Sequence, residues 1–120
     1  MLAKNNFYKI TAYEKGDASV NAVIEINAEH EIFSGHFPSQ PVVPGVCMMQ
    51  IVRELLEKAI GRPTVLKKGD DIKFLAVINP LVNNTISAVL KYSIAEDVVT
   101  VTATLSKDEL VHFKFKGSFQ

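Results

Sequence analysis

The sequence predicts an α+β domain in which an antiparallel sheet of about six strands curls around one long helix. Two observations predict it. Most of the chain alternates apolar and polar residues with a period of two, as strands with one buried face do. One segment is instead apolar over about half of a helical circumference. Such a helix is covered by other elements, and a sheet wrapped around it is the economical arrangement.

Six segments are expected to be strands, and short connections between the later ones predict antiparallel neighbours. Hairpin turns are expected at Ala95-Glu96-Asp97 and at Ser106-Lys107-Asp108. The expected strands are, in order, 7–13, 20–27, 72–78, 85–94, 99–105 and 111–116.

The helix is expected over 46–60. Pro44 stands at its entry, where a missing N–H costs nothing, and Gly61 followed by Pro63 marks its exit. Its apolar residues occupy about half of the helical circumference. The narrower polar arc consists of Gln50, Arg53, Glu54, Glu57 and Lys58.

Length and charge exclude several classes of protein. The 120 residues (13.3 kDa) predict one domain, 1–120, against a usual size of roughly 100–200 residues. Thirteen basic and thirteen acidic residues leave a net charge of +0, without the basic footprint of a nucleic-acid binder. No stretch approaches the roughly 18 apolar residues that span a bilayer, and no secretory signal pattern is visible. We therefore expect a soluble, cytoplasmic protein with neither nucleic-acid nor membrane partners.

The segment 30–50 carries the chemistry. Three prolines at three-residue spacing stiffen a loop that leads into the helix. The N–H groups of the first helical turn, around Gly45 and Val46, form a site for developing negative charge. His36, just before this loop, is a candidate base because the reference pKa of histidine lies near neutrality. Together these parts suit proton abstraction next to a carbonyl whose oxygen rests on the helix N-terminus.

This segment resembles a known family, the β-hydroxyacyl-(acyl carrier protein) dehydratases. The motif reads Gly35-His36-Phe37-Pro38, then Pro41, then Pro44-Gly45-Val46 and an amphipathic helix. The resemblance implies the hot dog fold, a sheet wrapped around one long helix. It further implies that His36 is the catalytic base and that the backbone at Gly45 binds the thioester carbonyl. A dimer would hold the acyl chain in a tunnel at its interface, with a helix residue of the partner completing each site.

The activity implied is dehydration of a β-hydroxyacyl thioester to the trans-2-enoyl thioester, without a cofactor, in fatty acid synthesis or a related polyene or polyketide pathway. An acyl carrier protein would present the substrate. A homodimer is expected, with a heterodimer or a higher oligomer as alternatives. Four basic residues are candidates for docking the acidic carrier, although a solvated loop is the simpler interpretation: Arg62, Lys67, Lys68 and Lys73.

One residue departs from the family pattern. The family's catalytic Glu or Asp lies fourteen residues after the histidine, where this chain has Gln50. An amide forms hydrogen bonds but does not titrate. Gln50 could orient the substrate hydroxyl while His36 returns its proton to the leaving group. The alternatives are a non-catalytic or partner-dependent acyl-binding subunit and, less favoured, a hot dog thioesterase.

Other polar side chains have simpler interpretations. Glu54 lies about 6 Å further along the helix and could supply the missing carboxyl group, but an i,i+4 surface pair with Lys58 is simpler. A second pair is expected between Arg53 and Glu57. His112 alternates with lysines and is expected to be exposed. Two further expectations are no metal site and, for Cys47, a small apolar residue in the wall of the site rather than a reactive thiol.

Overall fold

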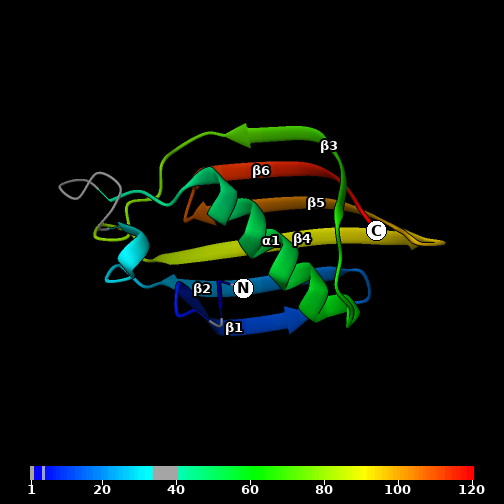
Figure 1. Cartoon of the computed structure of the whole chain (residues 1–120), viewed down its shortest axis with the longest axis horizontal. Coiled ribbons are helices and arrows are strands. Elements are labelled where there is room, and N and C mark those ends of the chain that lie inside the picture. The colour runs from blue at the N-terminus through cyan, green and yellow to red at the C-terminus, as the bar shows by residue number, and fades with distance from the viewer. Residues whose placement is uncertain (1, 4, 34–40) are drawn as a thin grey trace.

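A computed structural model of the chain describes residues 2–3, 5–33 and 41–120. Six strands form one sheet in the order β1-β2-β4-β5-β6-β3, and all neighbours are antiparallel. The helix α1 runs across one face of this sheet (Figure 1). The elements are β1 (Tyr8–Lys15), β2 (Ser19–Ile26), a 3-10 turn η1 (Glu31–Phe33), α1 (Gly45–Ile60), β3 (Leu66–Phe74), β4 (Thr85–Ala95), β5 (Val98–Lys107) and β6 (Leu110–Phe119).

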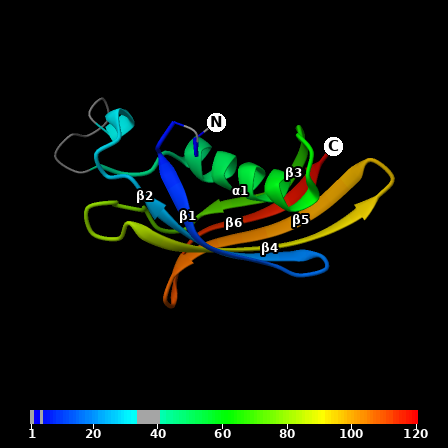
Figure 2. The ribbon, with the colours of Figure 1, turned by 90° about the horizontal axis from the view of Figure 1, so that it is seen from below.

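The core lies between α1 and the sheet. The sheet curves so that its concave face holds the helix (Figure 2). The apolar positions that alternate in the sequence are the buried ones in the middle of the sheet. Ile51, Leu55 and Leu56 of the helix are fully buried against them. The fold therefore confirms the expected sheet around a helix.

The helix begins and ends where the sequence predicts. Pro44 is its N-cap in an extended conformation, and Gly61 ends it in the left-handed region with φ 74°. The N–H of Gly61 donates to the carbonyl of Glu57. With sixteen residues, α1 is too short to cross a membrane, and no other helix in the described ranges is a candidate.

The strand expected at 72–78 is displaced. The observed β3 pairs with β6 from Leu66↔Phe119 to Phe74↔Phe113, and all nine of its residues are exposed. An exposed edge strand has no buried face, so its sequence does not alternate. After Phe74 the regular pairing ends: the N–H groups of Leu75 and Ala76 both donate to the His112 carbonyl. Further on, the Ile78 carbonyl accepts the N–H of Val43.

The expectation that His112 is exposed is wrong. Its side chain is buried, with 1% exposure. The β5–β6 register shifts at this point, since Leu105 faces Phe113 while Ser106 faces Val111. His112 is the extra residue of this bulge, where a strand loses its strict alternation of faces. Nδ1 of its ring lies 3.2 Å from the Ala76 carbonyl.

Candidate functional site

An apolar groove of about 330 Å³ runs between the first turns of α1 and the edge strand β3. The helix contributes residues spaced by three and four, which share one face. The lining consists of Gly45, Val46, Met49, Gln50, Arg53, Leu66, Ile72, Phe74 and Phe119. Several of these apolar side chains are exposed, with Val46 at 80% and Phe74 at 56%. A groove of this kind can accept an apolar chain.

The N-terminus of α1 opens onto this groove. The Pro44 carbonyl accepts the N–H groups of Cys47 and Met48, and the N-cap makes no side-chain hydrogen bond. Within the described ranges, no residue supplies an acceptor to the N–H groups of Gly45 and Val46. These two donors, at the positive end of the helix dipole, can stabilise an oxyanion.

Gly45 allows a close approach at this point. A Cβ atom at this position would lie 2.8 Å from two ring carbons of Phe74. Because that distance is shorter than real Cβ contacts, any other residue would displace the ring. Glycine therefore lets Phe74 form a wall of the groove directly beside the first N–H groups of α1.

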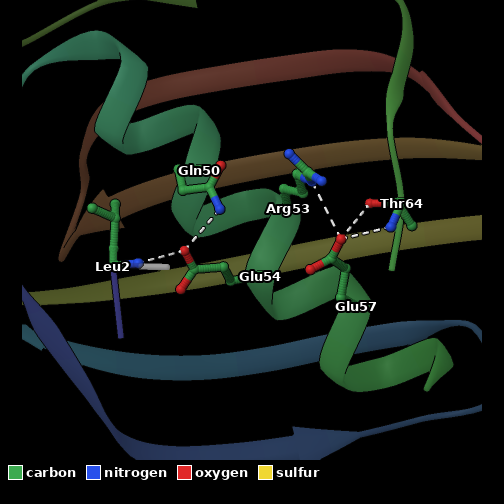
Figure 3. A network of polar contacts seen from close by, with 6 residues as sticks. All are labelled: Leu2, Gln50, Arg53, Glu54, Glu57 and Thr64. Carbon is green, nitrogen blue, oxygen red and sulfur yellow. Dashed lines mark hydrogen bonds and ion pairs between the residues drawn. The ribbon is translucent and has the colours of Figure 1, made fainter. Parts of the chain in front are cut away.

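Gln50 lines the groove one turn after Val46, and its side chain is hydrogen-bonded to Glu54. Its Nε2 donates to Glu54 Oε2 at 2.9 Å. Figure 3 shows the amide nitrogen turned toward Glu54 and the oxygen turned away from it. Gln50 is thus hydrogen-bonded to a carboxylate four residues further along the helix.

The predicted surface pair between Glu54 and Lys58 is wrong. Glu54 is only 6% exposed, and its carboxylate accepts four hydrogen bonds. Besides Gln50, the donors are the N–H groups of Leu2 and Ala3, at 2.8 and 3.1 Å, and the Tyr8 hydroxyl at 3.0 Å. The N-terminal segment covers this part of the helix, which a helical wheel does not reveal. Lys58 instead lies over the Tyr13 ring, 5.1 Å from its centre.

The second predicted pair is confirmed. Arg53 Nε lies 3.2 Å from Glu57 Oε2. The same oxygen accepts the Thr64 N–H and, at 3.1 Å, its hydroxyl (Figure 3). Glu57 therefore fixes the segment that follows α1, as Glu54 fixes the N-terminal segment.

Burial controls the ionisation of two groups near the helix. Desolvation raises the pKa of the Tyr8 phenol, and the charge and hydrogen bond of Glu54 raise it further. Burial also raises the pKa of the Cys47 thiol, although it lies in the first turn of α1. This buried thiol with a raised pKa agrees with a small apolar residue rather than a reactive thiol, but Cys47 packs in the core and is not among the residues that line the groove.

The structure brings three of the four predicted site residues together: Gly45, Val46 and Gln50 line one groove. The fourth, His36, lies outside the described residues. Sequence analysis missed Phe74 and the contact between Gln50 and Glu54. For that contact, the spacing of four residues was the available signal, because such residues are neighbours on a helix.

The remaining polar candidates carry little chemistry. Two lysines of the basic stretch face acidic neighbours, with Lys68 3.3 Å from Asp70 and Lys73 3.5 Å from Asp71. These exposed pairs reduce the positive charge that a carrier protein would meet. No cluster of metal-binding side chains occurs among the residues described.

Comparison with known proteins gives a family match over most of the chain. The model of the ApeI-like family, described as ApeI dehydratase, matches residues 12–112. A 3-hydroxyacyl-(acyl-carrier-protein) dehydratase FabZ from Brucella ovis is 32% identical over 73 residues, which cover 54% of this chain and 46% of that protein. The FabZ of Rickettsia bellii is 21% identical over 100 residues, covering 83% and 64%. The chain thus spans about half the length of the Brucella relative.

Solved structures share the fold. The dehydratase heterocomplex ApeI:P from Xenorhabdus doucetiae matches with a TM-score of 0.74 at 18% identity, covering 92% of this chain and 95% of that one. A phenylacetic acid degradation-related protein from Ralstonia eutropha matches with a TM-score of 0.68 at 15% identity, covering 98% and 87%. At these identities the likeness concerns the fold, which is the hot dog fold.

Proposed function

Because the chain belongs to the ApeI-like dehydratase family, of the FabZ-like hot dog type, we propose that it dehydrates a β-hydroxyacyl thioester to the trans-2-enoyl thioester. The observation that carries the proposal is the apolar groove, in which two backbone N–H groups without an acceptor among the described residues stand about one helical turn from Gln50. An acyl chain, a thioester oxygen and a β-hydroxyl each find a complementary surface there.

The proposed reaction needs no cofactor. His36 removes the proton at the α-carbon, and the N–H groups of Gly45 and Val46 stabilise the negative charge on the thioester oxygen. The electron pair then forms the α–β double bond as the C–O bond breaks. The imidazolium of His36 returns its proton to the leaving hydroxide, which departs as water. Gln50, which lines the same groove, holds the hydroxyl in position and neither gains nor loses a proton.

We propose that the substrate arrives on an acyl carrier protein and that the chain, as one hot dog domain, works as a homodimer. The exposed edge strand β3 and the exposed residues of the groove favour an assembly that covers them. The pathway would be fatty acid synthesis or a related polyene synthesis. A heterodimer is the alternative assembly, and the solved ApeI:P heterocomplex is an example of one with this fold.

The test is mass spectrometry of β-hydroxyacyl chains on acyl carrier protein after incubation with the purified protein. We expect wild type to remove one water and leave the thioester intact, and His36→Ala to lose that activity by about 10²–10⁴-fold. Release of a free acid would instead indicate a thioesterase.

A second function, a partner-dependent subunit without activity of its own, is favoured by one observation. Gln50 supplies no titratable group, and Glu54 behind it is engaged by four donors. No dehydration by the homodimer at any chain length, followed by dehydration on addition of a second hot dog subunit, would establish this function instead.

A further inference from the structure

The hydrogen bond between Gln50 and Glu54 determines the orientation of the Gln50 side-chain amide. An ionised carboxylate only accepts hydrogen bonds, so Gln50 must present its NH₂ group to Glu54. The oxygen Oε1 is then turned away from Glu54, as Figure 3 shows. Since Gln50 lines the groove, a ligand there meets either the acceptor Oε1 or the second Nε2 hydrogen, and Oε1 is the atom turned furthest from Glu54.

The carboxylate of Glu54 is itself held in place, so this orientation is imposed. Each of its oxygens accepts two hydrogen bonds: Oε2 from Leu2 and Gln50, and Oε1 from Ala3 and Tyr8. The Tyr8 hydroxyl remains a donor because its surroundings raise its pKa. A buried carboxylate surrounded by four donors has no freedom to rotate and let Gln50 reverse its amide.

We propose that Glu54 is a positioning residue that makes Gln50 a hydrogen-bond acceptor toward the groove, so that the site selects acyl groups bearing a β-hydroxyl over those bearing a β-ketone. This proposal rests on the proposed function, because it assigns the acyl thioester to the groove. A β-hydroxyl donates to Oε1. A β-ketone brings only an acceptor, and the two oxygens repel each other.

The β-hydroxyacyl thioester gains one hydrogen bond to Gln50 Oε1, whereas the β-ketoacyl thioester places two acceptor oxygens against each other. We expect the β-hydroxyacyl thioester to bind about tenfold more tightly than the β-ketoacyl thioester of the same length. In Glu54→Gln, one acceptor oxygen faces four donors, so the Gln50 amide can take either orientation. The ratio of the two affinities should then fall to about twofold or less.

The probes are the β-hydroxybutyryl and acetoacetyl thioesters of pantetheine, compared by their dissociation constants in calorimetric titrations with every variant also carrying His36→Ala, so that neither thioester reacts. Two control variants change similar polar groups that form no hydrogen bond with Gln50. Glu57→Gln makes the same substitution at the carboxylate that binds Arg53 and Thr64. Tyr8→Phe removes the hydroxyl that donates to Glu54, but the carboxylate remains and can still only accept a hydrogen bond from Gln50. Both should lower stability yet keep the preference for the hydroxyl.

A second measurement needs no activity and no soluble Glu54 variant. In the wild-type protein, the side-chain NH₂ of Gln50 should give one nuclear magnetic resonance signal that is shifted downfield and protected from solvent exchange, as a proton bound to a carboxylate is. The signal is assigned by its loss in Gln50→Met. A pair of Gln50 protons that exchange as fast as those of an exposed glutamine would overturn the proposal.

The outcomes separate this proposal from the proposed function. A protected Gln50 proton and a hydroxyl preference lost only in Glu54→Gln support positioning, even if no dehydration occurs. Dehydration with equal binding of both thioesters would overturn positioning while leaving the activity standing. Equal binding would mean that the second Nε2 hydrogen, rather than Oε1, faces the ligand.

Discussion

Tyr8 illustrates how one buried contact determines the behaviour of a residue. Its side chain is 3% exposed, and its hydroxyl donates to Glu54 at 3.0 Å. Loss of the phenolic proton would leave two negative charges in contact in a desolvated place, and this is why the pKa of Tyr8 is raised. The residue thus contributes a neutral donor that the folded structure keeps at any ordinary pH.

This raised pKa predicts a loss of stability at alkaline pH. Above pH 10.0, the ordinary pKa of a tyrosine, the unfolded chain releases the Tyr8 proton and the folded chain keeps it. The stabilisation is complete below that pH and falls as pH rises, by at most about 1.4 kcal/mol per pH unit. Urea unfolding between about pH 8 and 11 should show a steeper loss for wild type than for Tyr8→Phe.

Cys47 must be separated from this effect, because burial raises its pKa in the same direction. Cys47→Ala removes the contribution of the thiol and provides the control. If wild type and Tyr8→Phe lose stability in parallel above pH of about 10, the Tyr8 phenol is not the group responsible.

At the scale of elements, the ends of α1 follow local rules and the edge strand does not. Pro44 and Gly61 bound the helix because proline lacks an N–H and glycine adopts positive φ readily. The limits of β3 depend instead on its partner β6, which no local pattern contains. For the same reason, the β5–β6 bulge that buries His112 does not appear in the alternation of its sequence.

The helix end gives a prediction free of packing effects. Gly61 has φ 74°, and a Cβ atom there would meet nothing within 4 Å. Gly61→Ala should therefore destabilise the protein by about 1 kcal/mol through backbone conformation alone. Gly61→Asn, which tolerates this conformation better, should cost less in the same urea titration. Equal effects of the two substitutions would mean that the left-handed cap is not what glycine provides.

At the scale of the whole molecule, exposed apolar side chains gather on one side. Val46, Ile72 and Phe74 stand at the junction of α1 with β3, and β3 is the edge of the sheet. The other end strand, β1, is exposed over much of its length but mainly through polar residues. This asymmetry favours assembly through the β3 side.

Ile72→Lys tests that assembly. A charge on the edge strand should oppose contact with another subunit, so sedimentation velocity should show a dimer for wild type and a shift toward monomer for the variant. Thr100→Lys, on an exposed position of β5, adds the same charge elsewhere and should leave the dimer intact. A wild-type monomer at micromolar concentration would contradict the proposed homodimer.

The parts of this protein that depend on near neighbours could be predicted from the sequence. The alternation of the middle strands, the ends of α1 and the positions of Gly45, Val46 and Gln50 on its first turns all follow from residues within a few positions of one another. These predict the sheet around a helix and three of the groove residues. The proposed base, His36, remains a prediction, since it lies outside the described residues.

The surroundings of those residues depend on contacts that join distant parts of the chain. Glu54 meets Leu2 across 52 positions of sequence, and this contact converts an apparent surface carboxylate into the buried acceptor that orients Gln50. Phe74 reaches Gly45 from another element, and β3 takes its limits from β6. The periodicity of the sequence predicts which face of a helix or strand is apolar. Which segment packs on that face depends on contacts and hydrogen bonds between residues far apart in the sequence.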